Sequence, residues 1–313
     1  MMNNVMVDNW FMENVVRSIF NNDTRHSRSY ADLLMAIILW EDVYYPNNSK
    51  SIWNVFPSQV QDKLHPIYDY ENEDSKEPYK QEIGDEVGCW LEWKEGPQKE
   101  PEIVSRNALR YMMLSSKNGC DYLPCEKRKS FLLKYFSPQR IQKALYRMKM
   151  QGSLDKTIEE YYSDTYKALL DFSDLNFEMP VLANFIFDNT PKGMTSVDYA
   201  FHLKNEGPVI NYRKYLSHVE DALETQNWSE LRYLLGCSTD VISDITSLDK
   251  KQIFSIGASI IPIPSLLLQI GGFNITASPS TISIAVEKCG SFKKMHLTFL
   301  RDLTKYAIND MHL

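Results

Sequence analysis

Residues 252–286 constrain the fold most strongly, because this run of 35 residues contains no ionisable side chain. A membrane-spanning helix needs about 20 predominantly apolar residues, so the run is long enough to be tested as one. It also contains Pro262, Pro264, Pro279 and eight serines or threonines. Each proline removes a backbone donor, and lipid offers no replacement partner. We therefore expect no stable membrane span here.

Alternation within the same run favours short strands. Ile282, Ile284 and Val286 alternate with smaller or polar residues, as does the pair Phe273 and Ile275. Side chains two apart share one face of a strand, so the pattern predicts extended segments buried by helices. The alternative is a membrane-acting effector that releases this segment on activation.

The rest of the chain has mainly helical periodicity, with apolar residues recurring at three- and four-residue spacing. The predicted fold class is α+β and predominantly α-helical, with a small extended or β element near residues 252–286. Helices are predicted over residues 5–20, 29–44, 104–116, 138–150, 155–171, 180–187, 195–205, 208–225, 228–247 and 291–309.

Gln151, Gly152 and Ser153 form the best candidate linker in the chain. We therefore expect a helical N-terminal lobe over residues 1–150, with an acidic loop and strand insert at 69–102. The C-terminal helical lobe then covers 151–313 and contains the extended segment. The length of 313 residues is compatible with two or more domains.

The composition is that of a cytoplasmic protein without a cofactor. The net charge is −7, and five cysteines are spread over the chain without metal-binding spacing. The six histidines form no pair at helical spacing. Glycine-rich phosphate loops and the common hydrolase and kinase motifs are absent from the sequence, so no motif predicts a nucleotide, a metal or a catalytic centre.

The charge distribution changes abruptly along the N-terminal lobe. Residues 69–102 carry 12 acids and 4 lysines, whereas residues 126–150 carry 8 basic side chains and one glutamate. Such a basic stripe can neutralise phosphates of a nucleic acid or meet an acidic protein; it can also remain solvated or dock on the acidic segment. The predicted binding residues are Lys127, Arg128, Lys134, Arg140, Lys143 and Arg147.

A second candidate site lies on the strand predicted within the acidic window. Glu92 and Lys94 share one face of that strand, and Asp85 lies upstream. Carboxylates beside a lysine hold Mg²⁺ in metal-dependent nucleases. The same short pattern also occurs at Asp74–Lys76 and Asp249–Lys251, so it is not specific. A metal-dependent nuclease is therefore kept as the alternative to a non-enzymatic protein.

Several short stretches resemble a broad group of helical bacterial proteins encoded near mobile elements and antiphage-defence genes. The stretches lie at residues 30–34, 39–46, 121–124 with 127–128, 180–182, 212–216 and 296–303. The resemblance implies a bacterial accessory or effector protein and carries no active site with it.

The sequence thus predicts a non-enzymatic interaction or regulatory component of a bacterial defence or stress-response system. Its expected partner is an acidic protein, with nucleic acid as the other candidate, and the expected contact is the basic helical patch. The alternatives are the metal-dependent nuclease and the membrane-acting effector.

Overall fold

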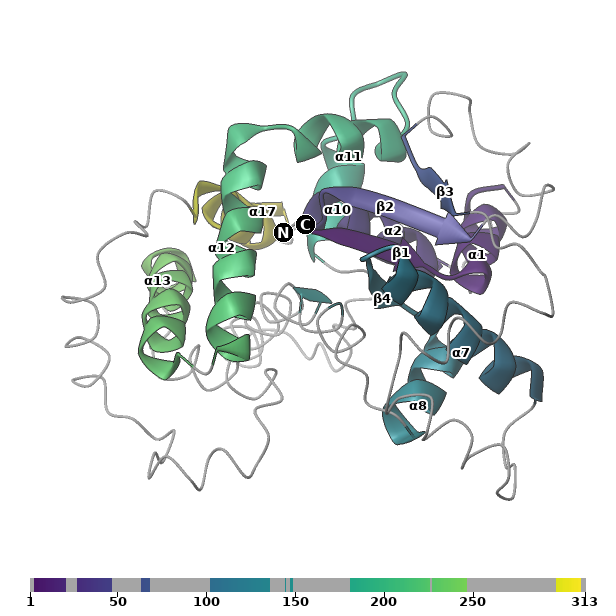
Figure 1. Cartoon of the computed structure of the whole chain (residues 1–313). Coiled ribbons are helices and arrows are strands. Elements are labelled where there is room, and N and C mark those ends of the chain that lie inside the picture. Colours follow the sequence, from purple (N-terminus) through teal and green to yellow (C-terminus); the bar gives the residue numbers. More distant parts are fainter. Residues whose placement is uncertain are drawn as a thin grey trace, which may run out of the picture. The chain divides into compact units, whose positions relative to one another are not determined.

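A computed structural model describes about half of the chain: residues 3–20, 27–46, 63–67, 102–135, 144, 147–148, 181–225, 227–246 and 297–310. The chain divides into two compact units, Met1–Leu145 and Tyr146–Leu313. Figure 1 shows the elements of both units, and each unit is described separately below.

The N-terminal unit contains a parallel four-stranded sheet with helices between its strands. The strands are β1 (Asn4–Val7), β2 (Asp42–Pro46), β3 (His65–Ile67) and β4 (Asp121–Leu123). The helices are α1 (Asn9–Phe20), α2 (Ser27–Leu39), α7 (Glu102–Lys117) and α8 (Glu126–Tyr135). The strand order is β3-β2-β1-β4, and every pair is parallel.

Side-chain alternation along the strands gives the sheet two buried faces. Met6 is in register with Tyr44 of β2 and with Tyr122 of β4, and this face packs against α7 and α8 around Tyr111 and Phe131. The opposite face carries the buried residues Val5, Val7, Val43, Tyr45 and Leu123. Burial on both faces is typical of parallel sheets and explains why the residues after the polar first position of β1, β2 and β4 are apolar or aromatic.

The sequence analysis missed this sheet because each of its strands is very short. It predicted one helix over 5–20, where the structure has β1 followed by α1, and one helix over 29–44, where α2 ends at Leu39 and β2 begins at Asp42. A short apolar run gives the same pattern in a buried strand as in one helical turn, so periodicity does not separate them. The N-terminal unit is therefore α/β in character: β1 precedes α1, and β2 follows α2.

The C-terminal unit is helical in the residues that the structure describes. Its helices are α10 (Val181–Asp188), α11 (Ser196–Lys204), α12 (Gly207–Glu224), α13 (Trp228–Thr246) and α17 (Thr298–Asp310). The first four follow the sequence prediction closely. Asn227 caps the N-terminus of α13, since the Glu230 N–H donates to Asn227 Oδ1 at 3.2 Å.

Aromatic contacts join α10, α12 and α17. The ring of Tyr212 on α12 lies 5.6 Å from that of Phe299 on α17, and Phe185 on α10 packs edge-to-face on Phe299 and on Tyr306. Tyr306 also donates to the carboxylate of Asp188. The described core of this unit is thus formed by the apolar faces of these helices, as the 3.6-residue period predicts.

The predominantly helical α+β fold class is confirmed. The predicted linker at 151–153, the helix at 155–171 and the extended segment 252–286 lie outside the described residues. Among the helices that are described, none combines the length and apolar character that crossing a bilayer requires.

Candidate functional site

The strand order creates a topological switch point, where the strands added after β1 change from one side of it to the other. From β1 the chain adds β2 and β3 on one side, and it then returns to place β4 on the other side of β1. In open parallel sheets, ligands bind outside the carboxyl ends of the strands at such a switch point. The residues that follow β1 and β4 are therefore the first place to look for a site.

Asp8 directly follows β1 and is fully buried. Its Oδ1 accepts from the Phe11 N–H at 3.0 Å, so Asp8 caps the N-terminus of α1. Its Oδ2 accepts from the Tyr122 hydroxyl at 3.2 Å and from the Cys125 N–H at 3.0 Å. One carboxylate thereby joins the β1–α1 junction to the β4–α8 junction, more than 110 residues away in the sequence.

Arg128, in the first turn of α8, completes this junction. Its side chain is fully buried, and Nη1 lies 3.1 Å from Asp8 Oδ2 and 2.8 Å from Asn9 Oδ1. Its guanidinium carbon lies 4.3 Å from the ring centroid of Trp10 and 4.9 Å from that of Tyr111. The aromatic rings attract the cation, but they do not replace in-plane hydrogen-bond acceptors.

The other edge of the Arg128 guanidinium is buried and makes no described hydrogen bond. Nε and Nη2 are buried and have no hydrogen-bond partner in the part of the chain that the structure describes. We call this pair the Nε–Nη2 edge. Leaving a buried donor unpaired costs on the order of 1–3 kcal/mol, and more when the group is charged. Such a group in a folded protein requires an explanation, either an ordered water or a ligand.

The junction holds its titratable groups in fixed protonation states. Burial and then the charge of Asp8 raise the pKa of the Cys125 thiol to about 12, and the same two causes raise the pKa of Tyr122 well above its usual range. Burial alone lowers the pKa of Arg128, but Asp8, Tyr122 and Cys125 outweigh it and the pKa is raised. At neutral pH the thiol and the phenol stay protonated and the guanidinium stays charged.

This arrangement suits binding better than nucleophilic or base catalysis. The Asp8 carboxylate already accepts three hydrogen bonds and pairs with Arg128, so both of its oxygens are engaged. A thiol with a raised pKa is a poor nucleophile. No group of three metal-ligating side chains occurs among the residues with described positions.

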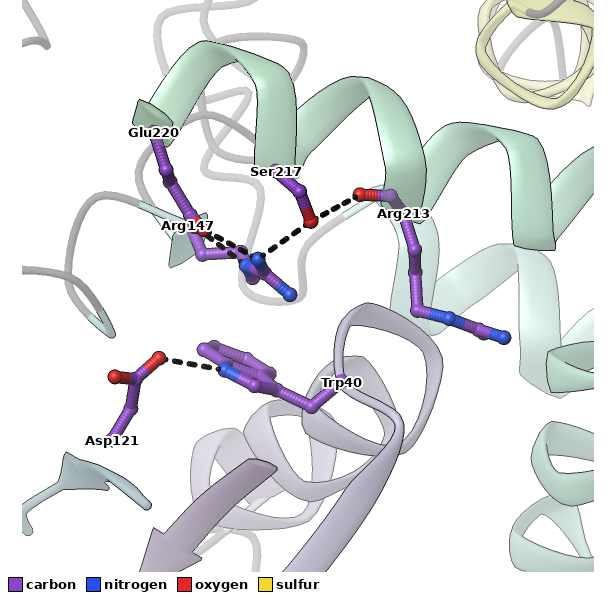
Figure 2. A network of polar contacts seen from close by, with 6 residues as sticks. All are labelled: Trp40, Asp121, Arg147, Arg213, Ser217 and Glu220. Carbon is purple, nitrogen blue, oxygen red and sulfur yellow. Dashed lines mark hydrogen bonds and ion pairs between the residues drawn. The ribbon is translucent and has the colours of Figure 1, made fainter. Parts of the chain in front are cut away.

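Arg147, in the C-terminal unit, makes the contrasting arrangement (Figure 2). Its side chain is also fully buried, with Nε 2.6 Å from Glu220 Oε1 and Nη2 2.5 Å from Glu220 Oε2. Nη2 also lies 3.3 Å from Ser217 Oγ, and that hydroxyl donates to the Arg213 carbonyl. Here the Nε–Nη2 edge is filled by a carboxylate from α12.

A separate contact in Figure 2 belongs to the amino end of the sheet in the N-terminal unit. The indole Nε1 of the buried Trp40 donates to Asp121 Oδ2 at 3.2 Å, which ties the end of α2 to the start of β4. At the same end of the sheet, His65 Nε2 lies 3.3 Å from Asp42 Oδ1. These contacts position the strands at the amino end of the sheet, away from the junction at Asp8.

Two members of the predicted basic patch are not at the surface. The sequence analysis placed Arg128 and Arg147 on a solvent-facing stripe, whereas the structure buries both and pairs each with a carboxylate of its own unit. Helical spacing identifies residues that share a face, but it does not tell whether that face meets solvent or a neighbouring helix. The side chains of Lys127, Lys134, Arg140 and Lys143 lie outside the described residues, so their role as a basic contact stays a prediction.

The residues of the nuclease alternative, Glu92, Lys94 and Asp85, also lie outside the described part of the chain. The sequence analysis selected neither Asp8 nor Cys125 as a site residue. A signal for Asp8 was present, because a short β-branched run followed by Asp-Asn is typical of a strand that leads into a capped helix. No local sequence pattern identifies its partners Tyr122, Cys125 and Arg128, since only the parallel pairing of β1 with β4 brings them to Asp8.

Comparisons with protein-family models, curated proteins and solved structures find no match for this chain.

Proposed function

We propose that the chain is a non-enzymatic regulatory component whose N-terminal unit binds a small anionic ligand at the carboxyl end of the sheet. One observation carries the proposal: Arg128 is fully buried, and its Nε–Nη2 edge has no partner among the described residues. The edge belongs to the junction between β1 and β4, where ligands bind in sheets of this topology.

The neighbouring groups support binding without a chemical step on the ligand. Both oxygens of Asp8 are engaged by donors, and burial raises the pKa of the Cys125 thiol to about 12. The bacterial defence or stress-response setting rests on the sequence resemblance, and the basic surface of Lys127, Lys134, Arg140 and Lys143 remains the proposed contact for a macromolecular partner.

Hydrogen–deuterium exchange on the full chain tests this proposal. The probes are mononucleotides, sugar phosphates and dicarboxylates at millimolar concentration. We expect at least one anionic probe to slow exchange at residues 8–11 and 124–128, because a ligand on Arg128 restrains both junctions. Peptides of α12 that carry Glu220 serve as the internal control and should not change. If no anionic probe alters exchange at either junction, the proposal is wrong.

A further inference from the structure

The Nε–Nη2 edge of Arg128 has the shape of a receptor for two oxygens of one group. The Nε–H and one Nη2–H of a guanidinium point in the same direction, so they donate in parallel to a carboxylate or phosphate. Arg147 demonstrates this pairing within the same chain, with both oxygens of Glu220 on the corresponding nitrogens. At Arg128 the same two nitrogens are buried and have no hydrogen-bond partner among the described residues.

The charge of the junction favours an anion in that position. Asp8 and Arg128 carry opposite charges and are 3.1 Å apart, so together they are close to neutral. The N-termini of α1 and α8 both meet at Asp8, which accepts from the Phe11 and Cys125 N–H groups. Each helix N-terminus is equivalent to about +0.5 charge, which leaves the junction positive.

Helix N-termini that follow parallel strands are typical phosphate positions. In many such sheets a glycine-rich loop brings backbone N–H groups close to the phosphate. Here the β1–α1 junction reads Val7-Asp8-Asn9, and Asp8 already occupies the cap of α1. A side chain must therefore supply the donors that a glycine loop would supply, and Arg128 reaches this junction from α8.

We propose that the ligand of this site carries a phosphate group, which accepts in bidentate fashion from Nε and Nη2 of Arg128 between the N-termini of α1 and α8. This inference rests on the proposed function and specifies its ligand. The phosphate is that of a free small molecule, because the edge is fully buried.

Isothermal titration calorimetry on the full chain provides the first test, with inorganic phosphate and acetate as separate probes. We expect phosphate to bind with at least about tenfold higher affinity than acetate. Arg128→Lys keeps the charge but lacks the parallel donors, so it should weaken phosphate binding at least about tenfold. Arg28→Lys is the matched control, because Arg28 is exposed and pairs only with the nearby Asp32 among the contacts described; it should leave the affinity unchanged.

A second measurement needs no variant that might misfold. The Arg128 Nε–Hε signal in a nitrogen–proton NMR spectrum of the wild-type chain should shift on addition of phosphate, because Hε then gains an acceptor. The Arg147 signal should stay in place, because Glu220 already fills that edge.

The outcomes separate this inference from the proposed function. If acetate and dicarboxylates shift the Arg128 signal and phosphate does not, the phosphate inference is wrong while an anion-binding function stands. If neither anion shifts the signal and neither binds, a water or the chain itself satisfies the edge, and both proposals fail.

Discussion

Arg128 in the N-terminal unit and Arg147 in the C-terminal unit both have fully buried side chains, but their hydrogen-bond partners differ. Arg147 has its Nε–Nη2 edge filled by Glu220, and a serine adds a further acceptor. Arg128 is held through Nη1 by Asp8 and Asn9, and its Nε–Nη2 edge is open. The pair at Arg147 shows that the chain can satisfy this edge of a buried guanidinium with a carboxylate. The proposal assigns the corresponding edge of Arg128 to a ligand.

The largest expected effect comes from removing the anion that holds Arg128. Asp8→Ala removes the acceptor of three hydrogen bonds and the ion-pair partner of Arg128, and it leaves a buried guanidinium with only Asn9 as a polar partner among the contacts described. Breaking one side of a buried pair costs about 3–5 kcal/mol. The free energy of unfolding of β1 and α1, measured by hydrogen exchange in urea, should fall by that amount.

The control for this change is Asp32→Ala. Asp32 pairs with Arg28, whose side chain is 61% exposed, and exposed pairs contribute about 0–1 kcal/mol. Equal effects of the two substitutions would show that Asp8 does not hold the junction together.

The next largest effect concerns the reactivity of the Cys125 thiol. With its pKa raised from 9.0 to about 12, the Cys125 thiol forms about 1,000-fold less thiolate at pH 8 than in the unfolded chain. A thiolate of higher pKa is also more nucleophilic, so the rate falls by less than the thiolate fraction. Iodoacetamide should therefore modify Cys125 at least about tenfold more slowly in the native protein than in guanidinium, as mass spectrometry of the Cys125 peptide can measure. Similar rates in both states would contradict the buried junction described here.

Replacing each arginine by lysine sharpens the comparison between the two units. A lysine at 147 loses the parallel pair with Glu220, and hydrogen bonds to charged groups contribute about 1.5–3 kcal/mol. A lysine at 128 can still donate to Asp8 and Asn9, which are the hydrogen-bond partners Arg128 uses in the structure. Without ligand, Arg147→Lys should therefore destabilise α12 more than Arg128→Lys destabilises α8.

The measurement is again the exchange-derived free energy of unfolding of each helix. A larger loss at α8 than at α12 would mean that the Nε–Nη2 edge of Arg128 is satisfied within the chain. Adding phosphate should widen the gap between wild type and Arg128→Lys and leave the Arg147→Lys difference unchanged.

The smallest expected effect concerns an ordinary helix cap in the C-terminal unit. Asn227→Ala removes the acceptor of the Glu230 N–H at the start of α13. Loss of such a cap costs about 1 kcal/mol. Exchange in the first turn of α13 should accelerate by about fivefold, and an unchanged rate would show that the cap contributes no stability.

The sequence predicts the described helices α10 to α13 of the C-terminal unit well because their signals are local. Asn227 with Glu230 and the apolar stripe of α12 each act within a few residues, so periodicity and capping place the helices. The N-terminal unit depends on pairing between distant strands. Val5 is in register with Val43 and with Asp121, and no local pattern indicates these neighbours.

The candidate site was even less accessible to sequence reasoning. Spacing grouped Arg128 and Arg147 with the other basic residues of 126–150, although Arg128 is paired with a residue 120 positions away and Arg147 with a residue 73 positions away. Only tertiary structure shows that these two arginines are buried.

A crystal structure of the full chain grown in phosphate tests the central claim most directly. The account predicts tetrahedral density with two oxygens about 2.7–2.9 Å from Nε and Nη2 of Arg128, and no such density at Arg147, where Glu220 holds the same edge. Density for a side chain of the same molecule, or for water alone, opposite the Nε–Nη2 edge of Arg128 would contradict it.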